Sequence, residues 1–290
     1  MSRRSVRIIP VLMLFFVFFV VLISTQAQSS AANEPTGIAA FFANWDAGAR
    51  RAEEAQPSWL TPVVTSSARI KQELRYDMSW QNNPTGATTD NYGGSKGFST
   101  IPIDRIEIGV NLPPYVVHNH STSPDGFGDF SIIAKLRMFA TKRDKGDYEF
   151  TAFLATSFPT GSHKNGSPHA VITPTIAGGK GIGPFVFQGT FGCDLPSAQT
   201  TLLGKRLILN NALQYRRLGR FWPEIEVNSN FFNQGPNDGK KQVYITPGIA
   251  ASHIPIRGRF ALNLAAAVEV AVTNFHSAAR QPVFSVRVPF

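Results

Sequence analysis

Apolar and polar residues alternate one by one over much of the chain. Between Ser67 and Trp80, six of the seven positions on one face are apolar and none on the other. The same alternation returns at 128–140, 148–158 and 259–272. Successive side chains of a strand point to opposite faces, so this period predicts β-strands. Several run to ten residues or more, longer than the ~5–6 of a soluble strand and close to the ~9–11 that cross a bilayer.

The polar faces of these strands carry charges of both signs. A membrane barrel turns its apolar face to lipid and encloses its polar face, and closure satisfies every backbone hydrogen bond. Aromatic residues at both strand ends are typical of the two interfaces of a membrane. They are Trp80, Tyr115, Phe158 and Phe231 at one end, and Tyr148, Phe185, Phe221, Phe260 and Phe290 at the other. The predicted fold is all-β, a transmembrane antiparallel up-and-down β-barrel.

Short and long connections alternate along the chain, which predicts about twelve strands with both termini in the periplasm and the long loops outside. The predicted ranges are 66–80, 97–103, 105–117, 128–140, 148–158, 170–177, 184–194, 206–216, 221–232, 241–252, 259–272 and 282–290. The pair 97–103 and 170–177 is short and carries Pro102 and Pro174. Without that pair the barrel has ten strands.

The last strand also alternates. One face holds Phe284, Val286, Val288 and Phe290, and the other holds Ser285 and Arg287. We expect this strand to close the barrel against the first. Its pattern resembles the C-terminal signal that the barrel assembly machinery of Gram-negative bacteria reads, which makes that machinery and outer-membrane lipid the expected partners.

The first 27 residues have the layout of a secretory signal peptide, with a basic start, an apolar run over 8–23 and a small-residue site ending at Ala27. An uncleaved anchor is the alternative, but the run is shorter than the ~20 residues of a spanning helix. Export and the strand pattern together predict the bacterial outer membrane as the location.

A periplasmic leader over 28–58 precedes the predicted barrel domain, 59–290. Its apolar residues recur at helical spacing: Ile38, Phe41, Phe42, Trp45, Ala49 and Ala52. The leader is therefore a short amphipathic helix or, in the alternative, a flexible segment.

Composition narrows the function. The single cysteine, Cys193, excludes a disulfide framework and a cysteine-based zinc site. Without the signal peptide, 25 basic residues face 19 acidic ones, and no basic cluster with interleaved aromatic residues indicates nucleic acid. We expect no cofactor.

The charges in the lumen phase of the strands are the main candidate site. An ion-selective pore would show one sign in excess, whereas here the signs nearly balance. This predicts salt bridges across the lumen that narrow or plug the barrel; the alternative is that the charges only solvate and stiffen it. The candidate pore-lining residues are Arg69, Lys71, Glu73, Arg75, Asp77, Asp129, Lys135, Arg137, Glu149, Glu224, Glu226 and Glu269.

The stretch "HNHSTSPDGFGD" brings His118, His120, Ser121 and Asp125 together in sequence. A Ser–His pair at the rim would suit an outer-membrane lipid hydrolase. The stretch is rich in turn residues, however, and the two histidines lack further metal ligands nearby. We therefore expect an external loop and no catalytic or metal site.

The motifs "IEIGVNLP", "GFGD" and "FPTG" follow one another in this order within 98–161. They resemble the outer-membrane proteins of the MetA-pathway of phenol degradation family, in which "LPTG" is usual where this chain has "FPTG". The resemblance implies a barrel that takes up or handles aromatic compounds. The favoured hypothesis is a channel or transporter for small hydrophobic or aromatic molecules. The alternatives are a structural or interaction barrel with a closed lumen and, less favoured, the lipid hydrolase.

Overall fold

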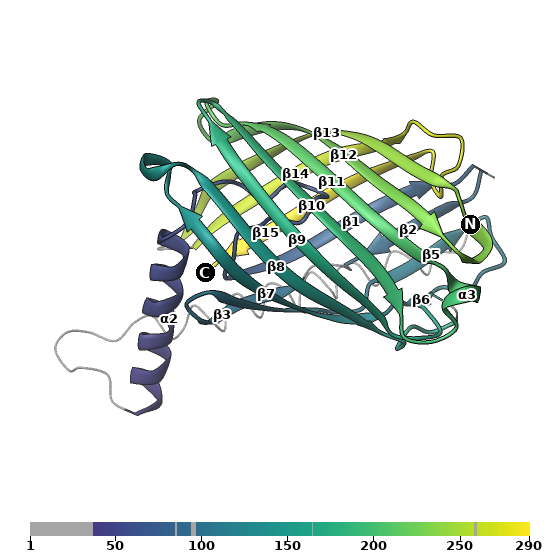
Figure 1. Cartoon of the computed structure of the whole chain (residues 1–290), viewed down its shortest axis with the longest axis horizontal. Helices are drawn as coiled ribbons and strands as arrows, with labels where there is room; N and C mark the ends of the chain where they lie inside the picture. Colours follow the sequence, from purple (N-terminus) through teal and green to yellow (C-terminus); the bar gives the residue numbers. More distant parts are fainter. Residues whose placement is uncertain (1–36, 85, 94–96, 164, 258–259) are drawn as a thin grey trace. The chain divides into compact units, whose positions relative to one another are not determined.

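The strands close into one barrel. The computed structural model describes residues 37–84, 86–93, 97–163, 165–257 and 260–290, so the predicted signal peptide lies outside the described residues. Fifteen strands lie in one antiparallel sheet (Figure 1). The sheet closes because β15 (Arg280–Pro289) pairs with β1 (Glu73–Asn82), as predicted for the last and first strands.

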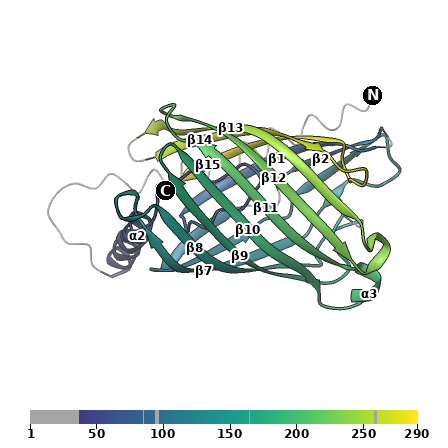
Figure 2. The same cartoon turned by 45° about the horizontal axis from the view of Figure 1, so that its top comes forward.

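The wall from β7 onward follows the sequence order, strand by strand (Figure 2). Its strands are β7 (Phe130–Thr141), β8 (Tyr148–Phe158), β9 (Val171–Ile182), β10 (Phe185–Pro196), β11 (Lys205–Tyr215), β12 (Phe221–Asn233), β13 (Lys241–Arg257) and β14 (Phe260–Ala271). A 3₁₀ turn, η3 (Arg143–Lys145), joins β7 to β8. The helix α3 (Thr200–Leu203) and a second 3₁₀ turn, η4 (Gly235–Asn237), lie in the long loops at the opposite end.

Three of the remaining strands are broken. β2 (Thr88–Tyr92) runs on into β3 (Phe98–Ile103), β4 (Ile106–Asn111) into β5 (Tyr115–Asn119), and β6 (Gly126–Phe127) into β7. β2 pairs with β1 and β5, and β3 pairs with β1 and β4, while β4 pairs with β7 and β5 with β6. Each broken strand therefore keeps a neighbour on both sides. Prolines at 113 and 114 remove two N–H donors at the second break.

Joining the broken strands gives twelve, which confirms the predicted number and makes the ten-strand alternative wrong. Two of the long outer connections implied by the predicted strand ranges, 81–96 and 118–127, are wrong in part, because they contain β2 and β6. Gly and Pro residues around these short strands concealed them in the sequence.

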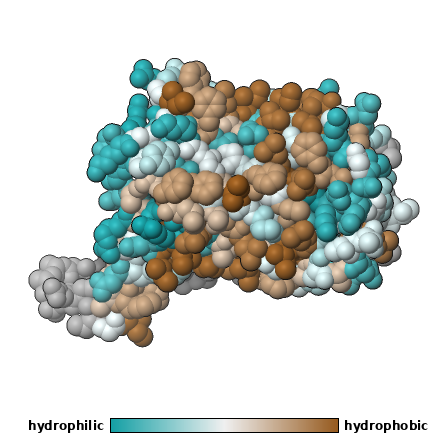
Figure 3. Space-filling view, viewed as in Figure 1, coloured by the Kyte–Doolittle hydropathy of each residue, from teal (hydrophilic) through white to brown (hydrophobic). Residues whose placement is uncertain are grey.

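The two faces of the wall differ as the alternation predicted. On β7, Leu136 and Met138 are 45% and 47% exposed, whereas Lys135 and Arg137 are 5% and 7% exposed. Outward apolar side chains cover a broad belt of the barrel (Figure 3). Such a belt is what a lipid-facing surface requires.

The leader contains the helix α2 (Ile38–Glu54), so the helical alternative is confirmed. In its first turns, Ile38 and Phe41 are exposed. Further along, the Trp45 indole donates to the Ile101 carbonyl at 2.8 Å, and Ala49 and Ala52 pack with Ile70 and Ile101. No helix in the described part of the chain is long and apolar enough to cross a membrane.

The predicted first strand, 66–80, is wrong at its start. β1 begins at Glu73, and the residues before it form no strand. Ala68 and Ile70, which the alternation placed toward lipid, are 1% and 0% exposed. An extended segment also turns successive side chains to opposite sides, so alternation alone does not separate it from a strand.

Candidate functional site

Residues 55–72, here called the luminal segment, lie between α2 and β1 and have no helix or strand. The segment is largely buried, and its hydrogen bonds run to inward-facing side chains of strands all around the barrel. Buried backbone N–H and C=O groups need partners. A segment that does not pair in a sheet needs other hydrogen-bond partners, and here the side chains of the barrel strands provide them.

Two glutamates of β12 bind the N–H groups at the middle of the segment. Glu224 Oε1 accepts from Val63 N at 2.8 Å. Glu226 accepts twice, from Val64 N at 2.8 Å and from Thr65 N at 2.6 Å, one bond to each oxygen. Hydrogen bonds to a carboxylate are stronger than those between neutral groups, so Glu226 holds two successive residues of the segment strongly.

Two arginines bind the carbonyls on the same stretch. Arg287 of β15 donates to the Thr61 carbonyl and, at 2.9 Å, to the Pro62 carbonyl. Arg75 of β1 donates to the Val63 carbonyl. The segment is thus bound on both its donors and its acceptors by buried charges of opposite sign.

Neutral and cationic side chains bind the rest of the backbone. Gln188 of β10 donates to the Leu60 carbonyl at 2.8 Å, and Thr151 of β8 donates to the Ala68 carbonyl at 2.5 Å. Lys135 lies 3.4 Å from the carbonyls of Ser67 and Arg69. These contacts hold the segment before and after the stretch that the glutamates and arginines bind.

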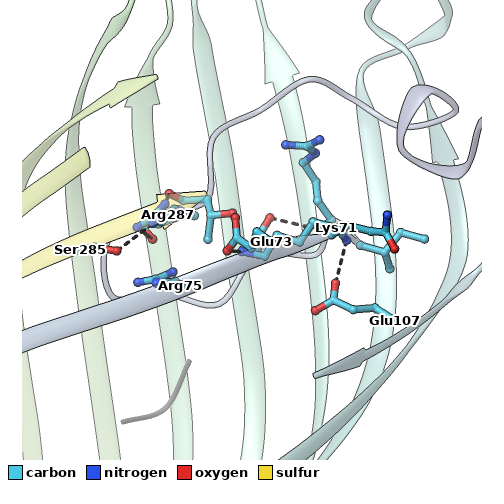
Figure 4. Close-up of polar contacts among 12 residues, drawn as sticks. Lys71, Glu73, Arg75, Glu107, Ser285 and Arg287 are labelled. Atoms are coloured by element: carbon cyan, nitrogen blue, oxygen red, sulfur yellow. Dashed lines mark hydrogen bonds and ion pairs between the residues drawn. The ribbon is translucent and has the colours of Figure 1, made fainter. Parts of the chain in front are cut away.

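The two arginines meet at the seam of the barrel. Arg75 and Arg287 lie directly opposite each other in the pairing of β1 with β15, and each is 2% exposed. Like charges in this position repel. Arg75 donates to Asp77 at 2.8 Å. Arg287 donates to the Ser285 hydroxyl at 2.9 Å (Figure 4). The segment's carbonyls add acceptors, so it stabilises the seam.

A second charged group surrounds the end of the segment. Lys71 pairs with Glu73, and its backbone N–H donates to Glu107 at 2.9 Å (Figure 4). Glu107 also pairs with Lys135 across neighbouring strands at 3.3 Å. This charge cluster joins the segment to β1, β4 and β7.

Apolar contacts hold the other side of the segment. Trp59, Leu60 and Val63 pack against a strip of inward-facing wall residues: Val186, Trp222, Ala250, Ala265, Ala267 and Val283. The Trp59 indole also donates to Asp147 at 2.8 Å. On β12, β14 and β15 the inward face therefore carries both apolar and charged side chains.

The structure brings most of the predicted lumen charges together. Buried on the inward face are Glu73, Arg75, Lys135, Arg137, Glu149, Glu224, Glu226 and Glu269, with Asp77 beside Arg75. Several of them bind the luminal segment. The ion pairs that they form in the described part of the chain join residues two apart or on neighbouring strands, and none of these pairs crosses the lumen as the prediction of a plugging salt-bridge network required. Glu149 has no hydrogen-bond partner on either oxygen among the described residues.

Three residues that were predicted to line the pore lie elsewhere in the structure. Arg69 and Lys71 belong to the luminal segment, so their predicted position on the barrel wall is wrong. Asp129 lies in the long-loop end, where it accepts from Gly161 N at 2.9 Å and Ser167 N at 2.7 Å. It fixes loops to each other.

Sequence reasoning missed the neutral half of the site, including Thr151, Gln188 and Gln214. Gln214 links Gln188 at 2.9 Å to Glu224 at 2.6 Å. These residues occupy the inward phase of their strands, which was the available signal. Nothing in that phase showed that a loop lay against them.

The histidine-rich loop does not form a catalytic arrangement among the described contacts. The His118 ring pairs with Asn165 at 2.7 Å, and its backbone N–H donates to Asp125 at 2.8 Å. The Ser121 hydroxyl accepts from Ser123 N at 3.1 Å. The described residues contain no group of three or more His, Cys, Asp or Glu residues placed to hold a metal ion.

No family model matches the chain, and no curated protein matches it. Among solved structures it is similar to the COG4313 outer membrane channel from Pseudomonas putida F1, with a TM-score of 0.56 and 12% identity over 80% of this chain and 100% of that one. The fold is that of an outer-membrane β-barrel.

Two further outer-membrane structures are more distant. The transport unit of the autotransporter AIDA-I from Escherichia coli has a TM-score of 0.39 and 12% identity, over 85% of this chain and 98% of that one. OmpT, an outer membrane protein of Vibrio cholerae, has a TM-score of 0.32 and 9% identity, over 79% and 99%.

Proposed function

We propose that this protein is a bacterial outer-membrane channel for small solutes and that the luminal segment is its gate. The observation that carries the proposal is the way residues 55–72 are held: buried in the barrel and bound, along their backbone, to wall side chains. The end of the barrel with short turns then faces the periplasm.

The segment is held by contacts that can break without opening the wall. Its bonds run to side chains, and the ladders of the barrel do not include it. A typical hydrogen bond contributes about 0.5–1.5 kcal/mol net, and one to a charged group about 1.5–3 kcal/mol. Losing a few of them together changes the position of the segment while β1 to β15 stay paired.

The apolar strip supports small hydrophobic or aromatic solutes, as the family resemblance implies. When Trp59, Leu60 and Val63 leave, the strip around Val186 and Trp222 becomes free for an apolar solute. Charged side chains on the same strands, such as Glu224 and Arg287, offer hydrogen-bond partners to the polar groups of a solute. A ring with one polar substituent matches both the apolar strip and these charges.

The test is conductance of the refolded protein in a planar bilayer. We expect discrete steps that membrane-impermeant benzenesulfonate reduces more than methanesulfonate does, because only the first anion carries a ring for the apolar strip. Equal block by both anions would contradict the preference for aromatic solutes, and the protein would then be a channel that lacks this preference.

A structural or interaction barrel is the second candidate, because the luminal segment is buried and bound to strands around the barrel. A folded, heat-modifiable barrel that never conducts, even after the segment's contacts are weakened by substitution, would establish this candidate and exclude the channel.

A further inference from the structure

A cavity of about 880 Å³ lies at the short-turn end of the barrel. Three parts of the chain line it: α2, the luminal segment and the η3 turn. Its residues are Arg50, Glu53, Glu54, Gln56, Ser58, Arg69, Lys142, Arg143 and Asp144. Its size is within the range of ~300–1,000 Å³ that small ligands occupy.

Several lining charges already have partners. Arg50 pairs with Asp46 one helical turn away, and Glu53 accepts from Gln72 N at 2.7 Å. Burial raises the pKa of Glu53 against the opposing effects of that bond and of Arg69. Arg50 and Glu53 are therefore already engaged within the protein.

Arg69 is different, because part of its guanidinium is unused. One terminal nitrogen donates to the Trp59 carbonyl, whereas Nε is buried and has no partner among the described residues. A buried donor without an acceptor is costly. Lys142 and Arg143 are exposed on the facing turn and bring two more cationic groups to the same cavity.

We propose that this cavity binds a small oxyanion, a carboxylate or a phosphate, with Arg69 as the principal donor and Lys142 and Arg143 as supporting cations. The site is separate from the apolar strip of the lumen and needs no conducting pore. An arginine fork matches the geometry of both anions, which a single ammonium does not.

Arg69 also connects this cavity to the luminal segment. The same guanidinium that faces the cavity holds the Trp59 carbonyl. An oxyanion on Arg69 competes for that donor, so occupation of the cavity weakens one anchor of Trp59. The two events are linked through one side chain.

The experiment is calorimetric titration of the full mature chain in detergent with benzoate, neutral benzamide and inorganic phosphate. We expect benzoate or phosphate to bind and benzamide not to. Arg69→Gln should weaken binding at least tenfold. The Lys142→Gln/Arg143→Gln double variant, on an exposed turn, tests the site without disturbing the lumen. Lys145→Gln, on the same turn but outside the cavity lining, is the matched control.

Tighter binding of benzoate than of phosphate would identify a solute carboxylate as the ligand, and the reverse order a phosphate group. Equal binding of benzoate and benzamide, or unchanged binding in the Lys142→Gln/Arg143→Gln variant, would overturn the proposal. Because binding is measured without a bilayer, its failure is distinct from the failure of the channel function.

Discussion

One of the two hydrogen bonds that Glu226 accepts from the luminal segment can be removed by an isosteric substitution. Each carboxylate oxygen of Glu226 accepts one N–H, from Val64 at 2.8 Å and from Thr65 at 2.6 Å. In Glu226→Gln the amide oxygen accepts one of these, but the NH₂ group then faces the other N–H. Two N–H donors then face each other where wild type has an N–H donor and a carboxylate acceptor.

The magnitude follows from one lost bond to a charged group, about 1.5–3 kcal/mol. A difference of 1.4 kcal/mol corresponds to roughly a tenfold change in an equilibrium constant. If the lost bond stabilises only the closed state, the ratio of open to closed channels rises roughly 10- to 150-fold. The wall is unaffected, because the ladder bonds of β12 use backbone groups.

The assay is the open probability of single channels in a planar bilayer. Glu269→Gln is the matched control: it makes the same change on an inward residue of β14 that is 7% exposed and has no described hydrogen bond to the segment. The reasoning is refuted if folded Glu226→Gln channels open no more often than wild type, or if Glu269→Gln opens them equally.

Three further predictions test the packing and the ends of the barrel. A Cβ at Gly179 would lie 2.5 Å from the Trp59 ring and 2.8 Å from the Phe187 carbonyl of β10, so Gly179→Ala should displace Trp59 and raise the open probability, provided that the barrel still folds and shifts on heating as wild type does. Gly178→Ala, with its nearest contact at 3.5 Å, should not. A Cβ at Gly166 would lie 2.0 Å from Asp129, so Gly166→Ala should increase protease cleavage of the outer loops, and unchanged cleavage would contradict this. Burial raises the pKa of Glu53 above its ordinary 4.5, so α2 should dock most tightly below that pH and less tightly as the pH rises; a spin label on α2 should show this dependence in wild type and not in Glu53→Gln.

The barrel was predictable because its physics repeats along the chain. Each strand must show lipid an apolar face and the lumen a polar one, so Leu136 and Lys135 had to alternate. Closure followed from the same pattern in the first and last strands of the chain, and the pairing of Tyr76 with Val286 confirms it. The number of strands was recoverable even where prolines interrupted them.

The luminal segment was not predictable, because the signal that marks it is tertiary. Residues such as Ala68 and Ile70 alternate with polar ones as they do in a strand, and only the absence of a partner ladder separates the two cases. The inward charges were found, but their acceptors and donors are backbone groups, which every sequence has. Thus Glu224 and Arg287 were located correctly while their partners were not.

The most direct test of the gate is to tether the luminal segment to the wall. Asn228 donates to the Thr65 hydroxyl at 3.2 Å, so Thr65→Cys and Asn228→Cys place two thiols together, with Cys193→Ala removing the native one. The account predicts that the oxidised channel is silent and that a reductant restores conductance, with neither single-cysteine variant responding. Equal conductance of the tethered and reduced proteins would contradict a gate formed by residues 55–72.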